Sequence, residues 1–146
     1  MKKQITQKDL GHISREIIEG CMNIKKQTAH VVALSGDLGA GKTTLTQHIA
    51  HELGIGEKIQ SPTFVIMKFY PITRPKSVYK KLIHIDAYRL SNDEELKNLG
   101  WDTYLASPEN LIIVEWPEHV SGCIPLDAGR IYLSHIDDET RSLEIS

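Results

Sequence analysis

The spacing of apolar residues in the first third of the chain predicts a helix, a strand and a second helix. Apolar positions recur every three or four residues over about 7 to 23, which is the period of a helix with one buried face. A continuous apolar run at 30–35 is typical of a strand that is buried on both faces. The helical period returns from Lys42 and stops near Gly54, a residue that often ends helices.

The same reading of the remaining sequence predicts five strands and one short helix. β-branched and aromatic residues favour a strand at 63–70, and apolar runs favour strands at 82–86 and 111–114. A short helix is expected at 93–100, with Asn92 as its cap and Gly100 as its stop. Residues 129–136 and 141–145 resemble a C-terminal hairpin. We therefore expect an α/β fold over residues 1–146 as a single domain, with a mainly parallel sheet flanked by helices and antiparallel additions.

Composition limits the possible classes of protein. The chain has 146 residues, 17 Lys and Arg, 19 Asp and Glu, and a formal net charge of -2, which argues against a strongly basic nucleic-acid binder. Its two cysteines form no CxxC pair, so zinc-ribbon and disulfide-rich classes are not favoured. No apolar run approaches the length of a membrane span, and the N-terminus does not resemble a signal peptide. These features predict a cytoplasmic protein that does not contact a membrane.

The segment GDLGAGKT at 36–43 carries the strongest chemical signal. It matches the phosphate-binding pattern G-x-x-x-x-G-K-[ST] and lies between an expected strand and an expected helix, as that pattern requires. Glycines let backbone N–H groups surround phosphate oxygens, and the start of the helix favours negative charge. We expect the lysine of the motif to reach the β- and γ-phosphates and the following threonine to ligate Mg²⁺. The expected nucleotide-binding residues are Asp37, Leu38, Gly39, Ala40, Gly41, Lys42, Thr43 and Thr44.

Two acidic residues follow apolar runs and are candidates for the metal site. Asp86 ends the run LIHID and Glu115 ends LIIVE, so both are expected at the carboxyl edge of the sheet, where α/β folds bind ligands. The alternative is that each acid only opens a loop or caps a helix. A third candidate is the hydroxyl in Ser-Pro-Thr-Phe at 61–64, which either contacts the γ-phosphate and its metal or belongs to a turn that enters a strand.

Four segments together resemble one protein family. They are GDLGAGKTT at 36–44, SPTF at 61–64, HIDAYRL at 84–90 and VEWPE at 114–118. In this order they resemble the TsaE (YjeE) family of small bacterial P-loop ATPases, and the resemblance covers about residues 6 to 118. It implies a P-loop NTPase fold and binding of ATP and Mg²⁺. It also implies a role, with the partner proteins TsaB and TsaD, in making threonylcarbamoyladenosine beside the anticodon of tRNA, which is contacted indirectly through the complex.

The resemblance also implies roles for particular residues. Asp86 corresponds to the acid that holds the metal, and Glu115 corresponds to a second acid near it. Thr63 corresponds to a switch-like catalytic residue, and Trp116 lies beside the nucleotide. Thr6 falls in a segment that lies near adenine in this family.

Some residues carry expectations that the motifs do not settle. The segment 71–81 is more basic than the usual turn of the family, and it either meets tRNA phosphates or an acidic partner or is a solvated hairpin tip. We expect His84 to be a buried, hydrogen-bonded strand residue and assign Arg130 a role in nucleotide binding.

Besides the ATPase, two functions remain open. One is a small-molecule or nucleoside kinase, and the other is a nucleotide-dependent switch. The guanine motifs NKxD and TKxD are absent from the sequence.

Overall fold

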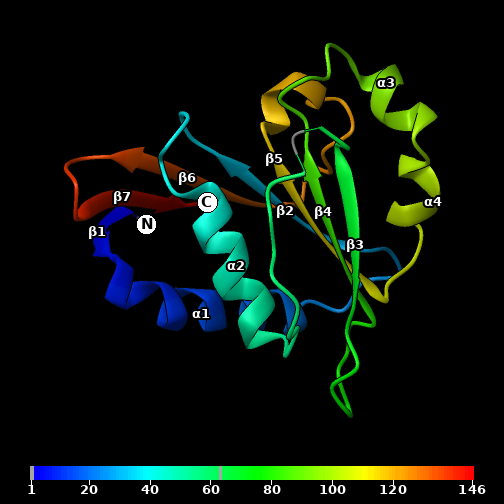
Figure 1. Ribbon diagram of the computed structural model, residues 1–146. Coiled ribbons are helices and arrows are strands. Elements are labelled where there is room, and N and C mark those ends of the chain that lie inside the picture. Colours follow the sequence, from blue (N-terminus) through cyan, green and yellow to red (C-terminus); the bar gives the residue numbers. More distant parts are fainter. Residues whose placement is uncertain (1, 63) are drawn as a thin grey trace.

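A seven-stranded mixed sheet forms the centre of the computed structural model, which describes residues 2–62 and 64–146 (Figure 1). The strand order is β1-β7-β6-β2-β5-β4-β3. The strands are β1 Lys2–Thr6, β2 His30–Ser35, β3 Met67–Pro71, β4 Lys81–Asp86, β5 Asn110–Glu115, β6 Gly129–His135 and β7 Thr140–Ile145. Strands β6, β2, β5 and β4 are parallel, whereas β1, β7 and β3 pair in an antiparallel manner. The expected α/β fold, with its mainly parallel sheet and C-terminal hairpin, is confirmed.

Helices cover both faces of the sheet because the central strands are apolar on both sides. Helices α1 (Leu10–Met22) and α2 (Lys42–Glu52) pack on one face, against a cluster that includes Leu34, Leu82 and Ile113. Helices α3 (Asp93–Asn98) and α4 (Trp101–Leu105) pack on the other, against the neighbouring positions of the same strands. Consecutive residues of one strand therefore belong to different cores, whereas residues two apart share one, as the period of two requires.

The register of β4 and β5 determines which side chains share a face at the carboxyl edge. Asp86 is paired with Glu115, the last residue of each strand. Leu82 on β4 and Ile113 on β5 belong to the cluster under α1 and α2. Since alternate residues point the same way, Asp86 and Glu115 also face α2, and so does His84. The two acids are thereby placed beside the start of α2.

Two elements, β1 and α4, were not predicted, and two others begin or end at residues that differ from those expected. Strand β1 was not predicted, and the first helical turn after it is a short 3-10 helix, Gln7–Asp9, before α1. The strand expected at 63–70 begins only at Met67, because Ile66 adopts a left-handed conformation (φ 68°) that breaks extended structure. The helix expected at 93–100 stops at Asn98, and Gly100 (φ 98°) turns the chain into the unpredicted α4.

Among the described residues, no helix has the length and apolar character that crossing a membrane requires. The basic loop between β3 and β4 extends from the end of the sheet opposite to the carboxyl edge of the parallel strands (Figure 1). Arg74 does not project freely from this loop, since its guanidinium donates to the carbonyl oxygen of Glu52 at 2.8 Å at the end of α2. Lys76, Lys80 and Lys81 are exposed.

Candidate nucleotide-binding site

The glycine-rich loop lies between the carboxyl end of β2 and the start of α2, as the sequence predicts. Gly41 has a φ of 105° and directly precedes the first residue of the helix. At the other end of the loop, a Cβ atom on Gly36 would lie 2.4 Å from the carbonyl oxygen of Leu133 on β6. Such an approach excludes any side chain at this position, so the loop can leave β2 only through a glycine.

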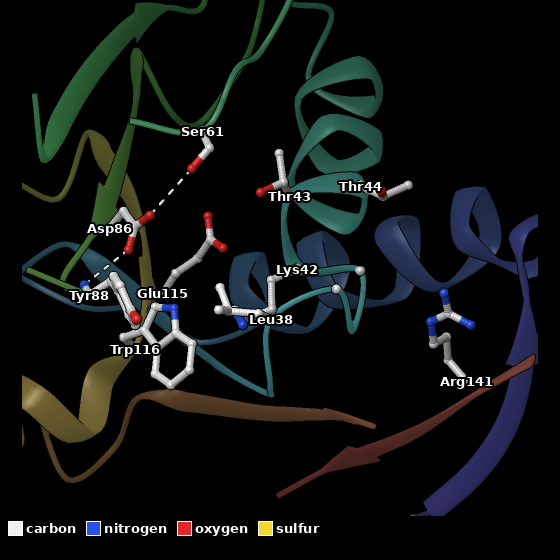
Figure 2. A pocket seen from close by; sticks show the side chains of 12 residues that line it. Leu38, Lys42, Thr43, Thr44, Ser61, Asp86, Tyr88, Glu115, Trp116 and Arg141 are labelled. Atoms are coloured by element: carbon white, nitrogen blue, oxygen red, sulfur yellow. Dashed lines mark hydrogen bonds between the residues drawn. The ribbon is translucent and has the colours of Figure 1, made fainter. Parts of the chain in front are cut away.

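A cavity of about 350 Å³ opens beside this loop (Figure 2). It brings together the loop, the ends of β4 and β5, and one residue of the C-terminal hairpin. Its lining residues are Leu38, Gly39, Gly41, Lys42, Thr43, Thr44, Ser61, Asp86, Tyr88, Glu115, Trp116 and Arg141. Most of the residues assigned to the site from sequence therefore share one cavity, although they come from segments far apart in the chain.

Lys42 is buried at the base of the cavity and its ammonium contacts the loop itself. Nζ donates to the carbonyl oxygens of Gly36 and Asp37, the latter at 3.1 Å, and lies 4.4 Å from the centre of the Trp116 ring. Burial lowers the pKa of Lys42 from its usual value, and the nearby carboxylate of Glu115 is the largest influence that opposes this shift. A bound phosphate would offer this ammonium stronger acceptors than the carbonyl oxygens it now contacts.

Asp86 and Glu115 are both buried at the cavity wall, with exposed fractions of 5% and 3%. The Asp86 carboxylate accepts a hydrogen bond from the backbone N–H of Tyr88 at 3.0 Å and one from the hydroxyl of Ser61 at 3.3 Å. No group of three or more His, Cys, Asp or Glu side chains placed to hold a metal ion occurs among the residues described. Two carboxylates beside the Thr43 hydroxyl suit Mg²⁺, which keeps several waters and takes further oxygens from phosphates.

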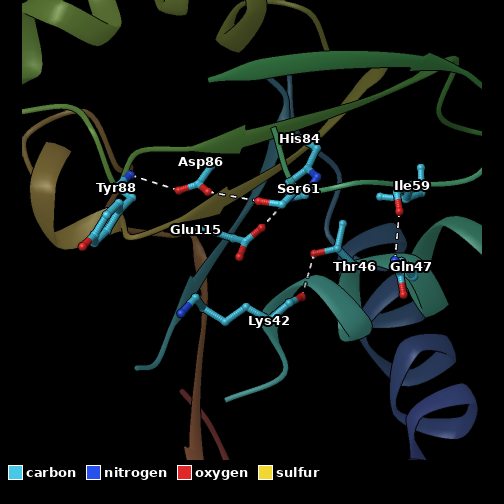
Figure 3. A network of polar contacts seen from close by, with 9 residues as sticks. All are labelled: Lys42, Thr46, Gln47, Ile59, Ser61, His84, Asp86, Tyr88 and Glu115. Atoms are coloured by element: carbon cyan, nitrogen blue, oxygen red, sulfur yellow. Dashed lines mark hydrogen bonds and ion pairs between the residues drawn. The ribbon is translucent and has the colours of Figure 1, made fainter. Parts of the chain in front are cut away.

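Glu115 is connected to His84 in a polar network at the carboxyl edge (Figure 3). Oε2 of Glu115 lies 2.5 Å from Nε2 of His84, which is fully buried. The expectation that His84 is a buried, hydrogen-bonded strand residue is confirmed. The first turn of α2 is held nearby by the Thr46 hydroxyl, which donates to the carbonyl oxygen of Lys42 at 3.0 Å.

Trp116 forms the aromatic wall of the cavity. Its backbone is left-handed (φ 58°), directly before the 3-10 helix Pro117–Val120. Its ring centre lies 5.1 Å from that of Tyr88 and 5.6 Å from that of His119. Nδ1 of His119 is also 2.9 Å from the carbonyl oxygen of Ala87, so the cluster ties the end of β4 to the segment after β5. A non-glycine residue in this conformation is uncommon and is typical of functional sites.

A smaller cavity of about 60 Å³ continues from the main one. The two share Gly41, Thr44 and Arg141, and the smaller one is also lined by Thr6 and Ala40. The structure thus brings Thr6 next to the phosphate-binding loop. Its backbone N–H is tied to the Asp9 carboxylate at 2.8 Å.

Three expected site residues stand apart from this arrangement. Asp37 belongs to the glycine-rich loop but is not among the described residues that line either cavity, and its carbonyl oxygen accepts from the ammonium of Lys42. Arg130 lies in β6 and is not among the described residues that line either cavity, and the arginine found there is Arg141 of β7. Sequence reasoning missed Arg141 because no local pattern marks it, and only the pairing of β7 with β1 places it near Thr6. Thr63 lies outside the described residues.

A glycine-rich loop between a parallel strand and a helix, with acids at the ends of two neighbouring strands, defines a P-loop NTPase fold. The match to the family model described as "Threonylcarbamoyl adenosine biosynthesis protein TsaE" covers residues 7–143. The chain belongs to the TsaE family. The crystal structure of Bacillus subtilis YdiB resembles this structure with a TM-score of 0.69 and 26% sequence identity, over 98% of this chain and 82% of that chain.

Relatives in several bacteria support this assignment. A Haemophilus influenzae protein named tRNA threonylcarbamoyladenosine biosynthesis protein TsaE is 31% identical over 131 residues, which are 90% of this chain and 78% of that protein. A Bacillus subtilis protein of the same name is 35% identical over 113 residues, or 77% and 66% of the two chains. One from Streptomyces coelicolor is 44% identical over 89 residues, or 60% and 57%. The resemblance inferred from four short motifs is therefore confirmed.

Proposed function

We propose that this protein binds and hydrolyses ATP with Mg²⁺ as part of threonylcarbamoyladenosine modification of tRNA, acting with TsaB and TsaD in the cytoplasm. One observation carries the proposed chemistry. The ammonium of Lys42, the hydroxyl of Thr43 and the carboxylates of Asp86 and Glu115 converge on one cavity beside a glycine-rich loop. The names of the relatives supply the pathway.

The proposed division of labour follows from the positions of these groups. Lys42 turns from the loop carbonyls to the β- and γ-phosphates, and the loop N–H groups surround the same oxygens. Thr43, Asp86 and Glu115 are the groups that would hold Mg²⁺, which when bound neutralises charge that develops on the phosphates. Asp86 is our first choice for the metal, because it lines the cavity at the end of β4 and corresponds to the acid that holds the metal in this family. Glu115 either shares the metal or orients the water that attacks the γ-phosphate.

The base of the nucleotide has a candidate position in the smaller cavity. Thr6 and Arg141 line it, and it opens next to Thr44 at the start of α2. Alone it is smaller than a purine, but it shares Thr6, Asp138 and Glu139 with an open hollow of about 480 Å³, and the two together have room for the base beside the phosphate end. We assign adenine to this combined space, in agreement with the absence of the guanine motifs NKxD and TKxD from the sequence.

Phosphate release from ATP tests the proposal most directly. We expect Mg²⁺-dependent release by the wild-type protein, an increase when purified TsaB and TsaD are added, and loss of turnover in Lys42→Ala. If the two proteins change nothing and ATP is consumed only when a small-molecule acceptor is added, the chain is a kinase and the proposal is wrong.

A second variant separates binding from hydrolysis. If Glu115 acts only on the attacking water, Glu115→Ala still binds a fluorescent ATP analogue with Mg²⁺ but releases no phosphate. Loss of nucleotide binding in that variant assigns Glu115 to the metal instead.

A further inference from the structure

The two acids at the carboxyl edge are held by different kinds of partner. Asp86 accepts from a backbone N–H and from a hydroxyl on the loop that precedes β3. Glu115 has a longer side chain with more rotamers, and its hydrogen-bonded side-chain partner is His84, two residues before Asp86 on β4. Residues two apart on a strand share a face, and β4 and β5 are neighbours, so His84 reaches Glu115 diagonally across the pair.

The hydrogen bond fixes the form of the imidazole. Because a carboxylate only accepts hydrogen bonds, the proton of a neutral His84 lies on Nε2. Nδ1 is fully buried and has no hydrogen-bond partner within the part of the chain that the structure describes. Among the described residues, the imidazole of His84 therefore makes its polar contact through Nε2, which lies 2.5 Å from Oε2 of Glu115.

Folding alone does not account for a histidine at this position. Leu82, two residues before His84 on the same face of β4, is a fully buried apolar side chain. A buried ring nitrogen without a partner costs about 1–3 kcal/mol, which an apolar residue of similar size avoids. The histidine therefore serves the carboxylate that it contacts rather than the core that surrounds it.

The orientation of that carboxylate bears on the proposed chemistry. Figure 2 shows the end of Glu115 extending toward the space between Asp86 and Thr43, both of which line the cavity. A hydrogen bond to Oε2 restricts the last torsion of the side chain and leaves Oε1 to accept from another group. When a residue that orients a metal-binding side chain by a hydrogen bond is replaced, activity or metal affinity commonly falls by about 10–100-fold.

We propose that His84 is a positioning residue for ATP hydrolysis, whose Nε2–H holds Glu115 in the orientation that acts on the metal or the attacking water. This inference rests on the proposed ATPase function. His84 is not among the described residues that line either cavity. It works through Glu115, and the polar atom that matters is Nε2 rather than Nδ1.

The test uses the full chain with TsaB and TsaD and compares two replacements of His84. His84→Leu fills the site without a donor, and we expect kcat to fall by about 10–100-fold with the KM for ATP changed much less. His84→Gln offers an amide N–H in place of Nε2–H, and we expect it to restore most of the loss. In a Glu115→Gln background, His84→Leu has no further effect on kcat, because the group it positions is already altered.

A matched control is His30, a second buried histidine, which accepts from or donates to Tyr79 at 2.9 Å far from the cavity. We expect His30→Leu to lower the midpoint of urea unfolding, because the hydrogen bond to Tyr79 is lost, and to leave kcat unchanged. Unchanged kcat in His84→Leu overturns the inference. So does an equal loss in His84→Leu and His84→Gln accompanied by a lower unfolding midpoint, since that result describes a structural residue.

A spectroscopic measurement keeps the two proposals separable. Nitrogen-detected NMR of ¹⁵N-histidine-labelled protein reports which ring nitrogen is protonated. We expect a protonated Nε2 on His84 whose proton signal shifts in Glu115→Gln. A wild type that releases no phosphate refutes the proposed function, whereas an unprotonated Nε2 or a signal unmoved by Glu115→Gln refutes the positioning role.

Discussion

Replacing Gly36 by alanine tests how closely the phosphate-binding loop is fitted to the sheet. The new Cβ would lie 2.4 Å from the carbonyl oxygen of Leu133 and 3.2 Å from Cβ of Ala40. The first of these neighbours belongs to the backbone of β6, which pairs with β2 and β7 on its two sides and cannot yield locally. The loop or the strand must therefore shift as a unit.

Gly39→Ala is the matched comparison, because it changes the same residue type in the same loop. Gly39 has a φ of 81°, and a Cβ atom added there would have no atom within 4 Å. Gly39→Ala therefore incurs only the conformational cost of a positive φ, about 1–2 kcal/mol. Gly36, with a φ of 151°, adds the steric term of a close-packed site, about 1–3 kcal/mol. The reduced freedom of the unfolded chain, worth about 0.4–1 kcal/mol, is common to both variants and cancels.

Urea unfolding without nucleotide measures this difference. With a dependence on denaturant of about 2 kcal/mol per M, an extra 2 kcal/mol lowers the unfolding midpoint of Gly36→Ala by about 1 M relative to Gly39→Ala. Equal midpoints for the two variants would refute the argument that the loop is confined by β6. Saturating ATP is expected to raise the midpoint of the wild type more than that of Gly36→Ala, since a displaced loop binds phosphate less well.

Three further variants probe other parts of the molecule. Trp101 is 1% exposed and packs under the sheet, so Trp101→Ala should lower the free energy of unfolding in urea by about 3–5 kcal/mol. A loss below about 1 kcal/mol would contradict its place in the core. Arg74→Ala removes the donor to the Glu52 carbonyl and should cost about 0.5–1.5 kcal/mol while phosphate release stays at the wild-type rate, and a slower rate would tie this loop to the site. The backbone N–H groups of Glu139 and Thr140 donate to the Asp137 carboxylate and hold its pKa below the usual value. The carboxylate therefore stabilises the fold at pH values above the usual aspartate pKa, and this stabilisation is lost as the pH falls through the lowered pKa. The difference in melting temperature between the wild type and Asp137→Asn should therefore shrink from pH 7 to pH 3, and a constant difference would exclude this carboxylate as the cause.

The parts of the fold that sequence predicted are those that local pattern determines. The apolar run of β2, the glycines after it and the helical period of α2 lie next to one another in the chain, so one stretch of sequence defines the loop and its context. Asp86 and Glu115 were found because each follows an apolar run. Their position at the carboxyl edge also follows from sequence, since parallel strands of one sheet share that edge, whereas the adjacency of β4 and β5 came from the structure.

The parts that sequence missed depend on contacts between distant segments. In β1 only Ile5 is buried, so the strand shows no apolar alternation, and it exists because it pairs with β7. The strand expected at 63–70 failed in its first half, where Phe64 is 84% exposed and Ile66 is left-handed. The β propensity of these residues did not form a strand there.

The site shows the same division. Lys42 and Thr43 were assigned from a motif, whereas the contact between His84 and Glu115 needed the register of two strands. Arg141 became a lining residue only through the hairpin that carries it. Motifs thus locate the chemistry, and tertiary pairing selects the side chains that support it.

The pairing of the first strand with the last has a consequence for the order of assembly during synthesis. Lys2 lies opposite Glu144, so β1 has no partner until nearly the whole chain has left the ribosome. The core from β2 to β6 can form before that, with the phosphate-binding loop already packed against β6. The wall that Thr6 and Arg141 share is completed only when the two ends meet. A chain truncated before β7 would therefore keep the phosphate-binding loop but lack the surface assigned to the base. Nucleotide selectivity would be the last property that the nascent protein acquires.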